Sequence, residues 1–402
     1  MKIVLSAPWI DEERRASYRL VWALAAALER RRHEVHVCTS GLGRTPDRVV
    51  AESPVPVGVT VHELPSPSGD GWRTRGGTRR QRQWYTAITD QVTRLGAVDV
   101  VHHLGPEPLD SLIGLERSPT ATVVGPISGG EFIPSALRRD RPGHPVGVRL
   151  LDVGRRTLAR HPGIRAAVTA ADTVLATTGE TAALAQRLGA ERVLIEPAIV
   201  TDHWRQADAI APTIDDPLRA VWLGPPLPHR GLALALGIVA EVDIKVPIRL
   251  RVVGGVPADE RLDLLRRRPG MIERVEPVQP LGRYEIDKLL ADSDVLLWTA
   301  LAEPDGTDVA RALAAGLPVV ALDHHVGADL LATGGGVRLP VAPRPATIRA
   351  GARALAELYY DRRHARALGA EGRAIADGFT AATLAERLED VYRQAAAGRG
   401  RP

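Results

Sequence analysis

The residues best suited to bind a charged ligand lie in one stretch, from Glu303 to Pro318. An apolar run that predicts a buried strand leads to Glu303, which should therefore lie near the strand's carboxyl end, where ligands of parallel sheets bind. Gly306 lets the backbone approach a ligand closely, and a helix predicted to begin near Thr307 would point its free N–H groups at a phosphate. Gly316 and Pro318 then end that helix and start the next strand.

This stretch resembles the signature of glycosyltransferase family 4 and its relatives, E-G-x-G-x-x-x-x-E-A-M-A-x-G-x-P-V. The resemblance implies an α/β architecture, the GT-B fold, in which two Rossmann-like domains with parallel sheets enclose an inter-domain cleft. It also implies that Glu303 is a catalytic and donor-binding residue that holds the donor sugar, and that Gly306 and Thr307 contact the donor. The family mostly retains the configuration of the transferred sugar, so a retaining reaction is expected.

One position departs from the family pattern. The family's second glutamate, which binds ribose hydroxyls of the nucleotide, is replaced by Arg311. A carboxylate accepts two hydrogen bonds from a vicinal diol, whereas a guanidinium only donates and has the opposite charge. We expect Arg311 to enter the cleft and contact an anionic part of an altered donor. The alternative is a solvent-facing arginine in an inactive homologue.

A second match, from Leu223 to Gly231, is similar to the family's V-G-R-x-x-x-x-K-G segment. In the family, this arginine and lysine clamp the donor diphosphate and neutralise the charge that grows as it leaves. Arg230 takes the position of the lysine, whereas Pro225 replaces the first cation. The resemblance therefore implies half of the clamp, with Arg230 and Gly231 in the donor site. An ordinary surface arginine before a helix is the alternative.

The first half of the chain has a glycine-rich loop after a predicted strand. Gly129, Gly130 and Glu131 lie in a segment that resembles the G-P-x-G-G-G-E-x-x-P loop of one branch of the same family. Backbone amides of such a turn can cradle anionic or hydroxyl groups, so we expect this loop on the acceptor side. Upstream, His102 and His103 end another predicted strand, and only one of them can point into the cleft, because adjacent strand residues face opposite ways. We favour His103 as a catalytic group, the alternative being a structural histidine.

Composition and charge limit the class of protein. A net charge of +4 over 402 residues does not indicate a nucleic-acid partner. One cysteine, Cys38, excludes an intramolecular disulfide and a cysteine-rich metal site. No apolar run approaches the ~20 residues of a membrane-spanning helix and no signal peptide is evident, so we expect a cytoplasmic protein.

Residues 138–165 contain eight arginines. Four interpretations stay open for this segment: an acceptor cleft, a site for a phosphorylated substrate, a surface that lies on an anionic membrane, and a solvated helix face. Peripheral membrane contact is not favoured among them.

Apolar, β-branched runs alternate with longer helical segments, which is typical of parallel sheets covered by helices on both faces. The alternation stops in a segment containing Asp, Ala and Pro, and it restarts at Arg219. The last long helices are predicted over 347–368 and 384–396. The predicted division of the chain is an acceptor-side domain over 1–200, a linker over 201–217, a donor-binding domain over 218–382, and a returning C-terminal helix with its tail over 383–402.

These features predict a glycosyltransferase that moves a hexosyl or pentosyl group from an activated nucleotide phosphate donor to a hydroxyl or amine of a small molecule, with natural-product biosynthesis as one setting. The donor is a co-substrate, and Arg230 and helix dipoles would stabilise the leaving phosphate, so neither a metal nor a further cofactor is expected. Two alternatives stay open: a phosphoribosyltransferase that uses phosphoribosyl pyrophosphate, and an inactive GT-B homologue that binds another enzyme.

Overall fold

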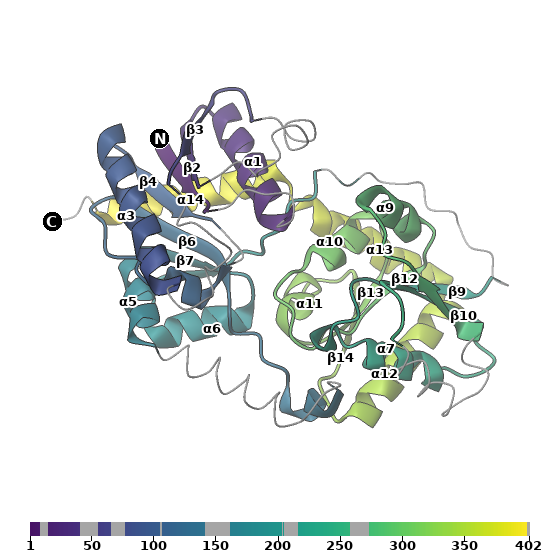
Figure 1. Ribbon diagram of the computed structural model, residues 1–402. Helices are drawn as coiled ribbons and strands as arrows, with labels where there is room; N and C mark the ends of the chain where they lie inside the picture. Colours follow the sequence, from purple (N-terminus) through teal and green to yellow (C-terminus); the bar gives the residue numbers. More distant parts are fainter. Residues whose placement is uncertain are drawn as a thin grey trace. The chain divides into compact units, whose positions relative to one another are not determined.

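The computed structural model describes residues 1–8, 15–40, 55–65, 77–104, 107–140, 161–202, 204, 216–257 and 273–399. The chain divides into two compact units, each with its own parallel sheet (Figure 1). The first unit contains residues 1–130, 152–200 and 380–402, and the second contains residues 131–151 and 201–379.

Eight strands form the sheet of the first unit, in the order β3-β2-β1-β4-β6-β7-β8 with the short β5 paired to β6. Their bounds are β1 (Lys2–Ser6), β2 (Glu34–Thr39), β3 (Val59–Glu63), β4 (Val100–His103), β5 (Glu107–Pro108), β6 (Ala121–Ser128), β7 (Thr173–Ala176) and β8 (Val193–Ile195). The central strand β1 is buried over most of its length, because helices cover a parallel sheet on both faces. The strand order reverses between β1 and β4, and a reversal of this kind opens a crevice at the carboxyl ends of the strands.

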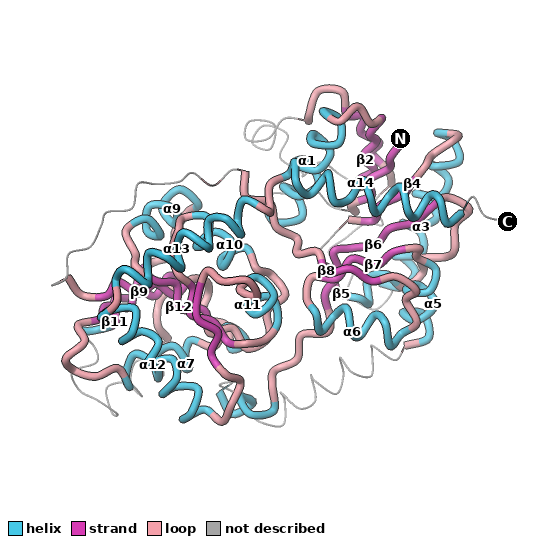
Figure 2. Tube along the Cα trace, turned by 180° about the vertical axis from the view of Figure 1, so that it is seen from behind, coloured by secondary structure: helices cyan, strands magenta, loops and turns pink. Residues whose placement is uncertain are grey.

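Two sets of helices cover this sheet. One set is α1 (Arg15–Arg30) and α14 (Ala381–Arg399), and the other is α3 (Gly77–Leu95), α5 (Pro162–Ala170) and α6 (Gly179–Leu188). Ile3 and Leu5 of β1 pack with the first set, whereas Val4 packs with the second, because alternate strand residues face opposite ways. Figure 2 shows α14 beside α1, although most of the chain separates them in sequence.

Buried polar contacts hold α14 to the first unit. Its Glu389 accepts hydrogen bonds from Arg31 Nε (2.5 Å) and His33 Nε2 (2.6 Å). The hydrogen bond from Arg31 is the main reason that the pKa of Glu389 falls to about 2. Arg387 of the same helix donates two hydrogen bonds to Glu196. The C-terminal helix is therefore an integral part of the first unit.

Six parallel strands form the sheet of the second unit, in the order β11-β10-β9-β12-β13-β14. They are β9 (Leu218–Trp222), β10 (Ile248–Val253), β11 (Val275–Val278), β12 (Val295–Trp298), β13 (Val319–Leu322) and β14 (Gly336–Leu339). Its helices are η4 (Ser135–Asp140), η5 (Pro228–Arg230), α7 (Leu232–Glu241), α9 (Arg283–Ala291), α10 (Thr307–Ala314), α11 (His325–Leu330), α12 (Arg344–Tyr360) and α13 (Arg362–Asp377). The helix α7 is apolar on most sides and packs in the core against α12, as expected for a helix with little exposure to solvent.

The structure differs from the sequence prediction in two described places. Residues 131–140 pack with the second unit instead of the first, because Ile133 and Leu137 are buried in its core. The helix predicted over 347–368 is two helices, since the carboxylate of Asp361 accepts a hydrogen bond from the N–H of His364 (2.8 Å) and caps α13.

Most of the predicted linker and of the arginine-rich segment lies outside the described residues. None of the helices described here is both long enough and apolar enough to cross a bilayer.

Candidate functional site

A tight turn positions Arg230. This arginine ends η5, and Gly231 follows in the left-handed conformation with a φ of 70°. A Cβ on Gly231 would lie 2.0 Å from the carbonyl oxygen of Thr299, so only glycine permits this close approach to the segment after β12. The hydroxyl of Thr299 donates a hydrogen bond to the carbonyl oxygen of Gly231 (2.9 Å). The turn thus holds Arg230 beside the residues that follow β12.

The guanidinium of Arg230 lies between two carboxylates. Its Nε is 2.8 Å from Oε2 of Glu303, and its Nη1 is 2.8 Å from Oδ2 of Asp308. The guanidinium carbon is 5.4 Å from the ring centre of Trp298, within the range of a cation–π interaction. The side chains of Arg230 and Glu303 are only 15% and 9% exposed. We call Arg230, Trp298, Glu303 and Asp308 the Arg230 cluster.

Burial makes the negative charge of this cluster costly. It raises the pKa of Glu303 to about 7, although the positive charge of Arg230 works in the opposite direction. The carboxylate of Asp305 contributes to the same rise. Burial also raises the pKa of Asp308. At neutral pH, Glu303 is therefore about half protonated and can either donate or accept a hydrogen bond.

The start of α10 lies next to the cluster, but its first N–H group already has a partner. Asp305 Oδ1 accepts hydrogen bonds from the N–H (2.9 Å) and the hydroxyl (2.5 Å) of Thr307. Gly306 has a φ of −87°, which any residue can adopt, so its conformational freedom is not used here. A phosphate at this helix end would have to displace Asp305 from Thr307.

Arg311 is buried and already paired. Its Nε lies 2.6 Å from Oδ1 of Asp287 in α9, and its Nη2 donates a hydrogen bond to the carbonyl oxygen of Arg283. It is 7% exposed, so it is not the solvent-facing arginine of one interpretation. Asp287 offsets its charge, just as Glu303 and Asp308 offset the charge of Arg230. No motif pointed to Asp287 as the partner of Arg311, because it lies 24 residues upstream in another helix.

The glycine-rich loop of the first half is a packing junction. The N–H of Gly130 donates to the hydroxyl of Thr181 (2.9 Å), and a Cβ on Gly130 would lie 2.4 Å from the backbone nitrogen of Thr181. Gly129 has a φ of 139°, a value that favours glycine. The loop therefore meets the start of α6 with one of its amides already bonded.

Glu131, the third predicted loop residue, belongs to the second unit and is buried. Its charge acts on His325 at the start of α11. Burial lowers the pKa of His325 to about 4, and the charge of Glu131 partly offsets this fall. The division between units therefore separates Glu131 from Gly129 and Gly130.

His102 and His103 face opposite sides of the first sheet, as strand alternation requires. His102 is fully buried, with Nε2 2.9 Å from the carbonyl oxygen of Gly125 and Nδ1 2.7 Å from the hydroxyl of Tyr392. A carbonyl only accepts, so Nε2 donates to it and Nδ1 accepts from Tyr392. Burial lowers the pKa of His102 to about 3, so the ring is neutral. Both ring nitrogens are satisfied, and this histidine has a structural role.

His103 packs against Tyr85 of α3, with ring centres 5.1 Å apart and planes at 87°. Its Nδ1 is buried and has no hydrogen-bond partner among the described residues. Burial lowers the pKa of His103 to about 4, so this ring is also neutral at pH 7. Of the two histidines, His103 is therefore the one available to a ligand.

The structure brings together only part of the predicted site. Arg230, Gly231, Glu303 and Thr307 lie close together in the second unit, whereas His103 and the two loop glycines belong to the first. Sequence reasoning missed Asp308 as the second acidic partner of Arg230, although the repeated acidic residues between 303 and 308 were a visible signal. Within the described part of the chain, no group of three His, Cys, Asp or Glu side chains is arranged to hold a metal ion.

Comparison with known proteins gives one family match. Residues 209–375 match the family model described as glycosyl transferases group 1. No curated protein matches the sequence significantly.

Among solved structures, the chain is similar to sucrose-phosphate synthase from Thermosynechococcus elongatus, with 16% identity, 99% of each chain covered and a TM-score of 0.67. It is also similar to HepE from Anabaena in complex with UDP and glucose, with 15% identity, 98% of this chain and 100% of the other covered, and a TM-score of 0.62. AviGT4, a glycosyltransferase involved in avilamycin A biosynthesis, has 19% identity, 99% and 98% coverage, and a TM-score of 0.55.

At these identities the structural likeness shows the fold alone. The expected GT-B fold is confirmed, and the resemblance to glycosyltransferase family 4 is compatible with the family match. The chain has the GT-B fold, and residues 209–375 match the family model of glycosyl transferases group 1.

Proposed function

We propose that this chain is a glycosyltransferase whose second unit binds an activated phosphate donor at the Arg230 cluster and transfers its glycosyl group to a hydroxyl or amine of a small molecule. The observation that supports this most is the fixed guanidinium of Arg230. A glycine turn holds it beside the end of a parallel strand and the start of α10, and its only ionic partners among the described residues are Glu303 and Asp308. A phosphate can replace both carboxylates, because it offers a guanidinium the same two-oxygen geometry.

The Arg230 cluster can stabilise a phosphate leaving group. When the bond between the anomeric carbon and the donor oxygen breaks, the electron pair stays on the phosphate, and Arg230 neutralises the growing charge. The acceptor's oxygen or nitrogen forms the new bond to the anomeric carbon, and its proton passes to the departing phosphate oxygen. Glu303, with a pKa of about 7, can hold a sugar hydroxyl as a hydrogen-bond donor or acceptor.

A nucleotide sugar is the favoured donor. Arg311 is bonded to Asp287 and to the carbonyl oxygen of Arg283, so it would have to leave both partners to bind the extra phosphate of phosphoribosyl pyrophosphate. HepE was solved with UDP and glucose, which makes UDP-sugars the first donors to test. Retention of configuration and a natural-product acceptor are part of the same proposal, and the anomer of the product, determined by NMR, tests the first of them.

Titration calorimetry with UDP, GDP, ADP and phosphoribosyl pyrophosphate tests the proposal. We expect a nucleotide to bind, and Arg230→Ala to weaken it by about ten- to a hundredfold, because charge-assisted hydrogen bonds contribute about 1.5–3 kcal/mol. Arg249→Ala is the matched control, since Arg249 lies exposed on β10 of the same unit and should leave affinity unchanged.

The outcomes separate the alternatives. Binding of phosphoribosyl pyrophosphate alone would favour the phosphoribosyltransferase. Nucleotide binding without turnover of any sugar nucleotide would favour the inactive homologue. Equal affinities for wild type and Arg230→Ala would contradict the placement of the phosphate.

A further inference from the structure

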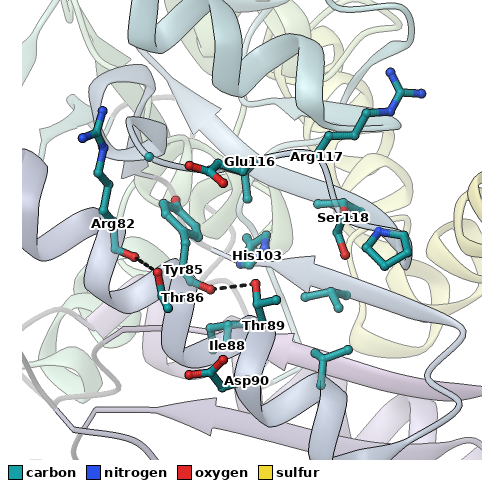
Figure 3. Close-up of a pocket in the computed structure, with 16 residues that line it drawn as sticks. Arg82, Tyr85, Thr86, Ile88, Thr89, Asp90, His103, Glu116, Arg117 and Ser118 are labelled. Atoms are coloured by element: carbon teal, nitrogen blue, oxygen red, sulfur yellow. Dashed lines mark hydrogen bonds between the residues drawn. The ribbon is translucent and has the colours of Figure 1, made fainter.

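The first unit contains a pocket of its own. Its volume is about 320 Å³, at the lower end of the ~300–1,000 Å³ that small-molecule sites occupy. Residues of α3 line one side and residues 114–119 line the other, with His103 of β4 between them (Figure 3). A Cβ on Gly114 would lie 2.5 Å from Cγ of Arg82, so the two sides meet tightly at this point. The pocket is therefore built from regular elements and a closely packed segment.

The inside of the pocket is apolar and its rim is charged. Four buried aliphatic side chains line it: Ile88, Val92, Val101 and Leu115. Two basic and two acidic side chains stand at its exposed edge: Arg82, Arg117, Asp90 and Glu116. None of these four forms an ion pair within the described residues. Because their charges balance, the rim favours a ligand without net charge.

His103 supplies an unused polar group in this pocket. Its Nδ1 is buried without a hydrogen-bond partner among the described residues, a state that costs free energy until a ligand or water bonds it. The neighbouring Tyr85 is fixed, because its hydroxyl donates to the carbonyl oxygen of Ser111 (3.2 Å) and its ring meets the imidazole edge-on. His103 is neutral, so it can hydrogen-bond a hydroxyl without adding charge.

We infer that this pocket binds a carbohydrate, as a single uncharged sugar ring. A sugar ring has apolar C–H faces that match the aliphatic interior, and hydroxyl groups that both donate and accept hydrogen bonds. Guanidinium and carboxylate groups at the rim can bond neighbouring hydroxyls, and His103 can bond another. An anionic ligand would gain no net attraction from a rim whose charges balance, and a purely apolar one would leave Nδ1 of His103 unbonded.

This inference is independent of the donor site, since all the residues involved belong to the first unit. Saturation-transfer NMR with glucose, galactose, mannose, rhamnose and N-acetylglucosamine tests it, with p-cresol and inorganic phosphate as probes of other chemistry. We expect at least one monosaccharide to bind with a dissociation constant of roughly a millimolar, as a ligand of this size allows.

Two threonines one turn apart on α3 provide a matched pair of variants. Thr89 lines the pocket and Thr93 does not, yet both are exposed and both donate their hydroxyl to the carbonyl oxygen four residues earlier (3.0 and 2.9 Å). Thr89→Tyr should fill the pocket and weaken sugar binding at least tenfold, whereas Thr93→Tyr should not change it. Neither variant should alter nucleotide affinity at the Arg230 cluster, so failure of this inference is distinguishable from failure of the proposed function.

His103→Phe keeps an aromatic ring but removes both imidazole nitrogens. It should therefore weaken sugar binding about fivefold, which corresponds to the loss of one neutral hydrogen bond. Circular dichroism and the melting temperature verify that each variant folds. The inference is overturned if no sugar binds up to roughly 50 mM, if p-cresol or phosphate binds and sugars do not, or if the two tyrosine variants behave alike.

Discussion

Replacing Glu303 by glutamine should make the second unit more stable at pH 8 while removing transfer activity. The pKa of Glu303 is about 7 in the folded chain, against an ordinary value of 4.5. Each pKa unit corresponds to about 1.4 kcal/mol, so ionising Glu303 destabilises the folded state by about 3 kcal/mol relative to the unfolded state. The attraction of Arg230 is already included in this value. Glutamine has nearly the same shape and cannot ionise, so it avoids the cost.

The size of the effect depends on pH. Below pH 4.5, Glu303 is protonated in both the folded and the unfolded chain, and the variant should match the wild type. The wild type then loses stability as the pH rises from 4.5 to about 7, and the difference is constant above that range. Scanning calorimetry at pH 4 and pH 8 measures it, with about 2–4 °C expected per kcal/mol for a unit of this size.

Glu276→Gln is the control, because its side chain is 49% exposed. Its melting temperature should follow the wild type at both pH values. If Glu303→Gln were less stable than the wild type at pH 8, the ionised pair with Arg230 would stabilise the fold and the reasoning above would be refuted.

Three other changes test other parts of the structure. Arg311→Glu sets a carboxylate against Asp287 and should lower the free energy of unfolding by about 3 kcal/mol in urea titrations. Adding Asp287→Arg should restore much of the lost free energy of unfolding. If Arg311→Glu alone were as stable as the wild type, the buried pair would be contradicted. Donor binding should take up protons at pH 8, because the negative charge of a phosphate raises the pKa of Glu303 further. Calorimetry in buffers of different ionisation enthalpy should detect this uptake. The affinity for the donor should also fall by up to about tenfold per pH unit above pH 7. Heats that do not depend on the buffer would argue against it. Tyr392→Phe removes the donor to His102 Nδ1 and should lower the free energy of unfolding by about 1–3 kcal/mol. An unchanged stability would mean that His102 finds another partner.

The strand–helix alternation was enough to predict two parallel α/β halves, because buried parallel strands are short, apolar and β-branched. It could not predict that residues 131–140 join the second unit. The apolar side chains of Ile133 and Leu137 would suit the core of either unit, and only the path of the chain in space decides which core they join. The break at Asp361 was visible in principle, since aspartate is a preferred capping residue, but the surrounding periodicity continues through it.

The site was predictable where a local motif determines geometry. The glycine after Arg230 is needed for contact with Thr299, and this contact brings Arg230 to Glu303, two residues that the family resemblance had placed in one donor site. The partner of Arg311 was not predictable, because a pair between two helices depends on how they pack. The orientation of His103 was predictable only relative to that of His102. Alternation separates it from His102, but only the sheet's packing shows which face meets α3.

The position of α14 has a consequence for the order in which the protein can fold during synthesis. The helix packs over Ile3 and Leu5 of β1, yet it is made only after the whole second unit, which lies between the two in sequence. The roughly 180 residues of 201–379 must be translated first, which takes roughly 10 to 40 s at ~5–20 residues per second. During that interval part of one face of the first sheet lacks its cover, so the nascent first unit is a natural client for a chaperone that binds apolar surface. The second unit ends at residue 379, so its core can form before α14 has been made.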